Sequence, residues 1–208
     1  LSTYFEARAN VRSFSRVNAS LPCGAREGVC APGMGTNAAF ALATQCYQTL
    51  MADGRKAKQA CDMNIVTPAL ENIIEANILL SGLGFESGGL AAAHGIVDGL
   101  TILPGTHKYM HGEEVAFGTL CHMMLENAPT EELDEVLNFC LDVGLPVCLA
   151  DIGVESISPE ELRQVAEKAS IPEESTHAMP FPVNAQTVAA AIVAADQIGR
   201  AYKRERAK

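Results

Sequence analysis

Residues 82–118 read GLGFESGGLAAAHGIVDGLTILPGTHKYMHGEEVAFG and decide how this chain folds. Glycines at four of the first eight positions let the backbone end one helix and begin another at close approach, because glycine has no Cβ. The alanines at 91–93 keep a neighbouring helix near, which places His94 in the interior. Pro104 and Gly105 interrupt the chain, and His111 opens the next helix. We therefore predict two adjacent helices that each contribute a histidine.

Two interpretations of His94 and His111 are open on the residues alone. Neutral imidazole is the commonest metal ligand in proteins. Two such ligands on facing helices need only one further group to hold zinc with a coordination position left open. The alternative is that both rings are ordinary packing residues, which is the more frequent role of a histidine on an apolar face.

The rest of the chain also shows helical patterns. A helix is predicted over 37–52, ending before a glycine that suits a C-terminal cap. Thr67 followed by Pro68 is the preferred order of N-cap and first helical position. Helical spacing puts five residues of the helix they open on one face, which predicts a core helix; these residues are Leu70, Ile73, Ile74, Asn77 and Ile78.

Three further helix starts follow toward the C-terminus. Thr130 is predicted to cap a helix with an apolar stripe at Leu133, Val136, Leu137, Cys140 and Leu141. Ser158 begins a capping box with a proline in the first turn, and Asn184 begins a long final helix. No segment alternates apolar and polar residues long enough to predict a strand. The sequence therefore predicts an all-α, multi-helix bundle, with residues 1–208 as a single domain.

Residues 10–36 interrupt this pattern with scattered glycines and prolines, which predicts an irregular loop. Loops longer than about 12 residues are usually functional or mobile. A Gly-Met-Gly within it does not follow a strand, so it lacks the context of a nucleotide-binding loop. Cys23 and Cys30 in the same loop are wrongly spaced for a zinc knuckle.

Composition excludes several classes of function. The net charge of −10 argues against nucleic acid and anionic membrane surfaces as partners, since both attract basic patches. No apolar run approaches the roughly 18 residues of a membrane span. The 7 cysteines form no C-x-x-C pair, which indicates reduced thiols in the cytoplasm or an organelle matrix. The basic end KRERAK is interpreted as a solvated helix end.

Long motifs in the chain resemble a known family. FESGGLAAAH at 85–94 and HGEEVAFG at 111–118 are similar to the glycerol dehydrogenase family, within the metal-dependent, so-called iron-containing alcohol dehydrogenases. The likeness continues in YFEARA at 4–9 and TPALENIIEAN at 67–77. It extends through LENAP and VGLPVCLAD, at 125–129 and 143–151, and so covers almost the whole chain.

The resemblance implies a fold and a site. The fold would be the C-terminal helical domain of the dehydroquinate synthase-like, iron-containing alcohol dehydrogenase type. In that family a Rossmann-like domain comes first, and an aspartate ligand lies two residues before the position of Leu1, so the chain is interpreted as a fragment. His94 and His111 would be two of three ligands of a catalytic zinc ion, and Phe85 would lie against the substrate. NAD would bind mainly to the other domain, and we assign no cofactor-binding residue here.

Five other polar residues near these motifs are weaker candidates. Thr3 matches the place where iron-using relatives carry an extra histidine, so the resemblance favours zinc. Asp98 is either a second-shell partner of His94 or, preferably, a surface charge. His107 is a rim or second-shell candidate, and His122 is interpreted as packed or solvated. His177 lies in a proline-rich loop with no evident partner.

The function implied by the resemblance is NAD-dependent oxidation of glycerol to dihydroxyacetone, with one zinc ion per chain as the Lewis acid. The predicted partners are a small polyol, the missing nucleotide-binding domain and further copies in a homo-oligomer, and the fragment alone is predicted to be inactive. Two alternatives are open: a helical oligomerisation or binding module without catalysis, and a related polyol phosphate dehydrogenase. A phosphate calls for a basic pocket, and the central stretch offers only Lys108.

Overall fold

The computed structural model describes residues 1–13 and 35–207, and within these ranges every regular element is helical. The α-helices are α1 (Ser2–Arg12), α3 (Asn37–Asp62), α4 (Pro68–Glu75), α5 (Ser81–Gly88), α6 (Ala92–Leu100), α7 (His111–Leu125), α8 (Thr130–Val143), α9 (Pro159–Lys168) and α10 (Ala185–Arg206). Short helices of other types are Ala76–Leu80, Thr106–Lys108, Leu149–Ile152 and Ser175–Ala178. The prediction of an all-α fold is confirmed.

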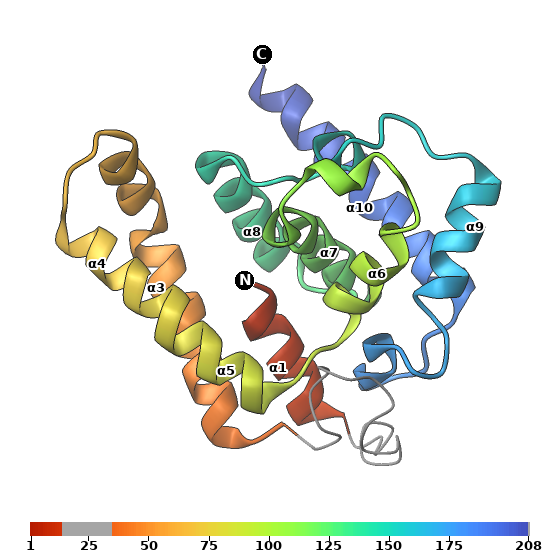
Figure 1. Cartoon of the computed structure of the whole chain (residues 1–208), viewed down its shortest axis with the longest axis horizontal. Helices are drawn as coiled ribbons and strands as arrows, with labels where there is room; N and C mark the ends of the chain where they lie inside the picture. Colours follow the sequence, from red (N-terminus) through yellow and green to blue (C-terminus); the bar gives the residue numbers. More distant parts are fainter. Residues whose placement is uncertain (14–34, 208) are drawn as a thin grey trace.

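Helix α1 lies between two groups of helices (Figure 1). On one side, α3 packs against α4 and α5, and both α3 and α5 contact α1. On the other side α6, α7, α8, α9 and α10 form the larger group, whose buried side chains make up most of the hydrophobic core. The N-terminal helix therefore contacts both groups, which also meet directly where α3 packs against α8.

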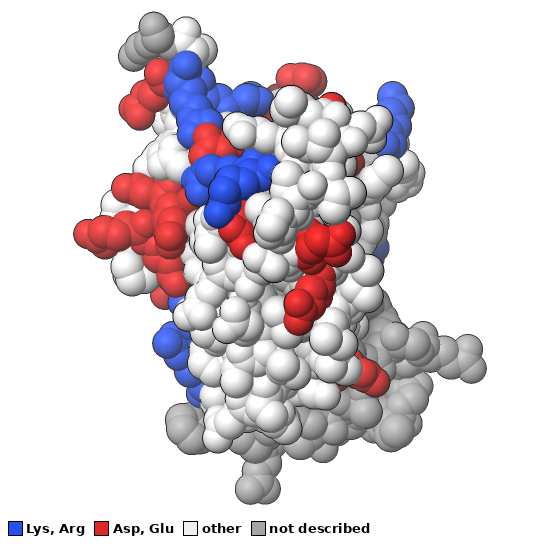
Figure 2. All heavy atoms as spheres, turned by 90° about the vertical axis from the view of Figure 1, so that its left-hand side faces the viewer, with Lys and Arg blue, Asp and Glu red and all other residues white. Residues whose placement is uncertain are grey.

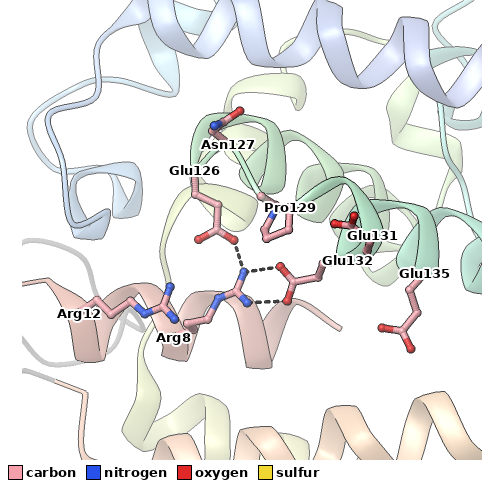
Figure 3. A pocket seen from close by; sticks show the side chains of 9 residues that line it. Arg8, Arg12, Glu126, Asn127, Pro129, Glu131, Glu132 and Glu135 are labelled. Atoms are coloured by element: carbon pink, nitrogen blue, oxygen red, sulfur yellow. Dashed lines mark hydrogen bonds and ion pairs between the residues drawn. The ribbon is translucent and has the colours of Figure 1, made fainter.

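Arg8 fastens α1 to the junction between α7 and α8 (Figure 3). Its guanidinium donates to both carboxylate oxygens of Glu132, at 2.6 and 3.1 Å, and also pairs with Glu126. The rings of Tyr4 and Phe5 lie 5.2 and 4.8 Å from the guanidinium carbon, within cation–π range. Because the Arg8 side chain is only 8% exposed, this cluster holds α1 at a fixed position.

Helix α3 is longer than predicted. It runs to Asp62 and passes through Gly54, which we had interpreted as a cap after residue 52. A Cβ atom on Gly54 would meet the Phe139 ring at 2.7 Å, so this glycine permits close packing of α3 on α8 and does not end the helix. A glycine inside a helix lowers its stability by only about 1 kcal/mol, which contacts of this kind outweigh.

The predicted core face of the helix after Thr67 is wrong. The structure exposes Ile74 and Ile78 (42 and 75% exposed) and buries no residue of α4. The π-helical turn Ala76–Leu80 follows, so α4 and α5 do not continue one register. Figure 2 views the molecule from this side and shows a wide area without charged side chains. The apolar stripe of α4 therefore lies on the surface of the chain.

The helix ends follow the sequence in most places. Thr67, Ser158 and Asn184 each accept a backbone N–H at the start of their helices, as predicted. The prediction for Thr130 is wrong, because α8 begins at Thr130 itself and Pro129 is its N-cap, without a side-chain bond. The apolar stripe of α8 is confirmed, with four of its five members buried.

The prediction that the basic C-terminal end is simply solvated is wrong, because two of its cations form ion pairs. Lys203 pairs with Asp151, and Arg206 lies 2.6 Å from Asp142, which also pairs with Arg55. These ion pairs tie α10 to α8 and to the short helix Leu149–Ile152.

The bounds predicted for the irregular loop, residues 10–36, are too wide at both ends. Asn10 belongs to α1, and Thr36 caps α3 with its side chain. Residues 14–34, which include Cys23, Cys30 and most of the Gly-Met-Gly, lie outside the described residues.

Candidate metal centre

The structure brings His94 and His111 together. His94 lies near the start of α6 and His111 is the first residue of α7. Their ring centroids are 5.3 Å apart, although 17 residues separate them in the sequence. The helices meet closely because Gly118 on α7 faces the Ala93 carbonyl, where a Cβ atom would come within 2.5 Å. Small residues therefore set the distance between the two imidazoles, as the Ala-rich stretch predicted.

Glu6 is a residue beside His94 that the sequence analysis did not single out. Its carboxylate is fully buried, and Oε2 lies 2.6 Å from Nδ1 of His94. Its other oxygen accepts the backbone N–H groups of Ala91 and His94, at 2.8 and 3.1 Å. The available signal was a lone acidic residue inside YFEARA, one of the stretches that carry the family resemblance. A glutamate is almost never fully buried without a partner.

The two partners change each other's pKa. Burial raises the pKa of Glu6, but the charge and hydrogen bond of His94 outweigh it, so the pKa of Glu6 lies below its ordinary value. Burial lowers the pKa of His94, but the charge and hydrogen bond of Glu6 outweigh it, so the pKa of His94 lies above its ordinary value. Each group therefore favours the charged form of the other.

Phe85 lies beside His94. It is 37% exposed at the end of α5, and its ring centroid is 6.2 Å from that of His94. Gly89, whose φ is 81°, ends α5 and lets the chain turn toward α6. Phe85 and the two histidines thus come from three successive helices.

Thr3 and Asp98 flank the same site. Thr3 is buried and forms a 3.0 Å hydrogen bond with Ser81, which joins α1 to α5. Asp98 is half-buried, and its charge adds to the raised pKa of His94.

The remaining histidines are outside this group of contacts. His107 is exposed and its Nε2 lies 2.8 Å from the Thr101 carbonyl. The prediction that His177 has no partner is wrong, because its Nε2 lies 3.1 Å from the Ser170 and Ile171 carbonyls.

His122 is fully buried against Phe5, and neither ring nitrogen has a hydrogen-bond partner among the described residues. Burial lowers its pKa to about 4. The ring therefore stays neutral in the folded protein at physiological pH.

This burial predicts a pH-dependent loss of stability. The unfolded chain takes up a proton at His122 near pH 6.5 and the folded chain only near 4, so His122 reduces stability as the pH falls through this window. Lowering the pH from 7 to 4 should therefore reduce the free energy of unfolding of the wild type by about 3 kcal/mol more than that of His122→Leu. Urea unfolding at the two pH values measures this, and equal pH dependence of the two proteins would contradict it.

The donor set around His94 is incomplete within the described part of the chain. There, no group of three or more His, Cys, Asp or Glu side chains is arranged to hold a metal ion. Among the described residues, His94 and His111 are therefore two candidate ligands without a third donor side chain beside them. The hollow around Arg8, about 660 Å³ in volume, contains neither histidine.

The sequence and the structure were compared with those of known proteins, and both are similar to glycerol dehydrogenases. A glycerol dehydrogenase from Thermotoga maritima is 52% identical over 82% of this chain and 47% of its own length. One from Escherichia coli is 47% identical over 99% of the chain and 53% of its own length. The solved structure of glycerol dehydrogenase from Schizosaccharomyces pombe superposes with a TM-score of 0.86 at 35% identity, covering 100% of this chain and 50% of that one.

The chain is a homologue of the glycerol dehydrogenases. The resemblance drawn from its motifs is confirmed, as is the match of its helical fold to the C-terminal part of these enzymes. No family model matches the sequence. The chain spans about half the length of the curated glycerol dehydrogenases that it matches. Among its described helices, none has the length and apolar character needed to cross a bilayer.

Proposed function

We propose that residues 1–208 are the metal-binding helical domain of an NAD-dependent glycerol dehydrogenase, which oxidises glycerol to dihydroxyacetone. The observation that carries the proposal is the pairing of His94 with His111, with Glu6 in contact with Nδ1 of His94 and the Phe85 ring beside it. The glycerol dehydrogenase homologues support the reaction class.

His94 and His111 would hold a zinc ion as two of its three protein ligands, and an aspartate upstream of Leu1 would supply the third. When bound, zinc supplies a Lewis acid that lowers the pKa of the substrate hydroxyl and stabilises the alkoxide. A donor set of two imidazoles and one carboxylate suits zinc, and it leaves a fourth position for the substrate oxygen.

The other site residues would orient the substrate and keep its surroundings dry. Phe85 presents a half-exposed ring beside His94, where it can contact the carbon chain of a small polyol. Glu6 holds His94 from the buried side, so that the imidazole cannot turn away from the substrate.

The nicotinamide and further subunits would bind through other surfaces. NAD would be held mainly by a preceding nucleotide-binding domain, as the resemblance implies. The exposed apolar side chains of the α4–α5 region support contact with such a domain or with a second copy; they are Ile74, Ile78, Leu79, Leu83 and Phe85. Large apolar areas on a surface commonly mark interaction sites.

The test is zinc content and activity of the intact protein that carries this chain. After extensive dialysis we expect about one zinc ion per chain, together with NAD-dependent oxidation of glycerol. A strong chelator should remove both, and added zinc should restore both. Retention of full activity after the metal is removed would refute the metal-dependent mechanism, and absence of glycerol oxidation from the zinc-loaded protein would refute the substrate assignment.

A further inference from the structure

We propose that Glu6 is a positioning residue that keeps the single proton of neutral His94 on Nδ1, so that Nε2 is the nitrogen available to a metal. The proposal deepens the proposed function and rests on it. Glu6 and His94 are 88 residues apart in the sequence, and only the packing of α1 against α6 brings them together.

The first support is that the two carboxylate oxygens of Glu6 contact different groups. Oε1 accepts two backbone N–H groups at the first turn of α6, from Ala91 and His94. Helix α6 has no side-chain cap of its own, so Glu6 caps it from another helix. A carboxylate at a helix N-terminus is also stabilised by the helix dipole. These bonds fix the orientation of the carboxylate.

The second support is the acceptor character of Oε2. An ionised carboxylate has no proton to donate, so the 2.6 Å contact requires the hydrogen to lie on Nδ1 of His94. A neutral imidazole then has its lone pair on Nε2. No described residue forms a hydrogen bond with that Nε2, and the His111 ring lies beside the His94 ring. The Glu6 carboxylate thus holds His94 with the Nε2 lone pair available before any metal binds.

The third support is the rigidity of the Glu6 backbone. Two residues along α1, Arg8 pairs with Glu126 and Glu132, and Thr3 bonds Ser81 on α5. Glu6 lies between these two attachments and is itself fully buried. Its carboxylate cannot follow a turning imidazole, so the proton position on His94 is decided by the fold.

The variant Glu6→Gln should change the hydrogen bond to His94 while it keeps the cap of helix α6. The amide oxygen of the glutamine can replace Oε1 and keep both backbone bonds to α6. Its NH₂ group then replaces Oε2 and donates to Nδ1, which moves the imidazole proton to Nε2. The reverse amide orientation would leave two backbone N–H groups facing a donor, so it is disfavoured. The variant should fold but hold zinc more weakly.

The measurement is ¹⁵N NMR of histidine-labelled intact protein without metal, at alkaline pH where His94 carries one proton. A difference spectrum against His94→Ala assigns the signals. We expect the Nδ1–H form in the wild type and the Nε2–H form in Glu6→Gln, with zinc affinity reduced about 10- to 100-fold. Glu86→Gln removes the same charge at an exposed position on α5 and should change neither.

Three results would overturn the assignment. They are an Nε2–H form in the wild type, an unchanged His94 spectrum in a folded Glu6→Gln protein, or a changed spectrum with unchanged zinc affinity. The wild-type spectrum decides the question even if the variant does not fold. The proton position is read without metal, so a wild-type protein that binds no zinc would refute the proposed function while the spectrum still tests Glu6.

Discussion

In the intact protein, His94→Ala and His111→Ala are each expected to remove bound zinc and to reduce glycerol oxidation roughly 1,000-fold or more. The estimate follows from the several kcal/mol that a Lewis acid contributes to an alkoxide-like transition state. Each change removes one of two imidazoles whose rings lie 5.3 Å apart. A site reduced to two protein ligands cannot hold zinc firmly.

The matched control is His107→Ala. His107 lies in the same connection as His111 but is exposed, and its ring nitrogen contacts the Thr101 carbonyl. We expect it to keep both zinc and activity. Zinc content is measured by atomic absorption after dialysis, and activity by the rate of NADH formation from glycerol. If the His94 and His111 variants still turn over at the rate of the His107 variant, the two central histidines only pack the helices.

Arg8→Met is expected to destabilise the protein by about 3 kcal/mol at pH 8, because it leaves two largely buried carboxylates without their cation. The Glu126 and Glu132 side chains are only 10 and 20% exposed. Figure 3 shows both paired with Arg8. Methionine keeps part of the packing on Tyr4 and Phe5, so the effect reports on charge more than on volume. Arg12→Met is the control, since Arg12 is exposed on the same helix.

The destabilisation by Arg8→Met should grow as the pH rises. Burial raises the pKa of Glu126, Arg8 lowers it, and repulsion from Glu132 adds to the rise, so the net pKa lies above its ordinary value. Removing Arg8 raises this pKa further. A raised pKa stabilises the folded state below the ordinary pKa and loses that effect as the carboxyl ionises. Urea unfolding at pH 5 and 8 should therefore show the larger loss at pH 8.

Neutralising the partners should reverse the effect. Adding Glu126→Gln and Glu132→Gln to Arg8→Met should recover most of the stability at pH 8, because no uncompensated charge is then buried. An Arg8→Met protein as stable as the wild type at pH 8 would show that the ion cluster does not hold α1 in place.

The errors of the sequence-based predictions have physical causes. Helical spacing correctly predicted a helix after Thr67. The sequence pattern of an apolar helix face is the same whether the face is buried in the chain or exposed on its surface. The structure exposes Ile74 and Ile78. A glycine can mark the end of a helix, but it can also make room for a neighbouring side chain. Gly54 does the latter, because a Cβ atom there would clash with the Phe139 ring. Such choices depend on which helix lies opposite.

The sequence by itself determined the helical class, most caps, the kinship with glycerol dehydrogenases, and the two histidines of residues 82–118. These depend on local periodicity, on capping side chains and on long motifs. Only the tertiary structure showed that Glu6 lies against His94 and that Arg8 fastens α1 across the fold. Those contacts join residues 88 or more positions apart, and their partners are chosen by the packing of whole helices, which no local pattern encodes.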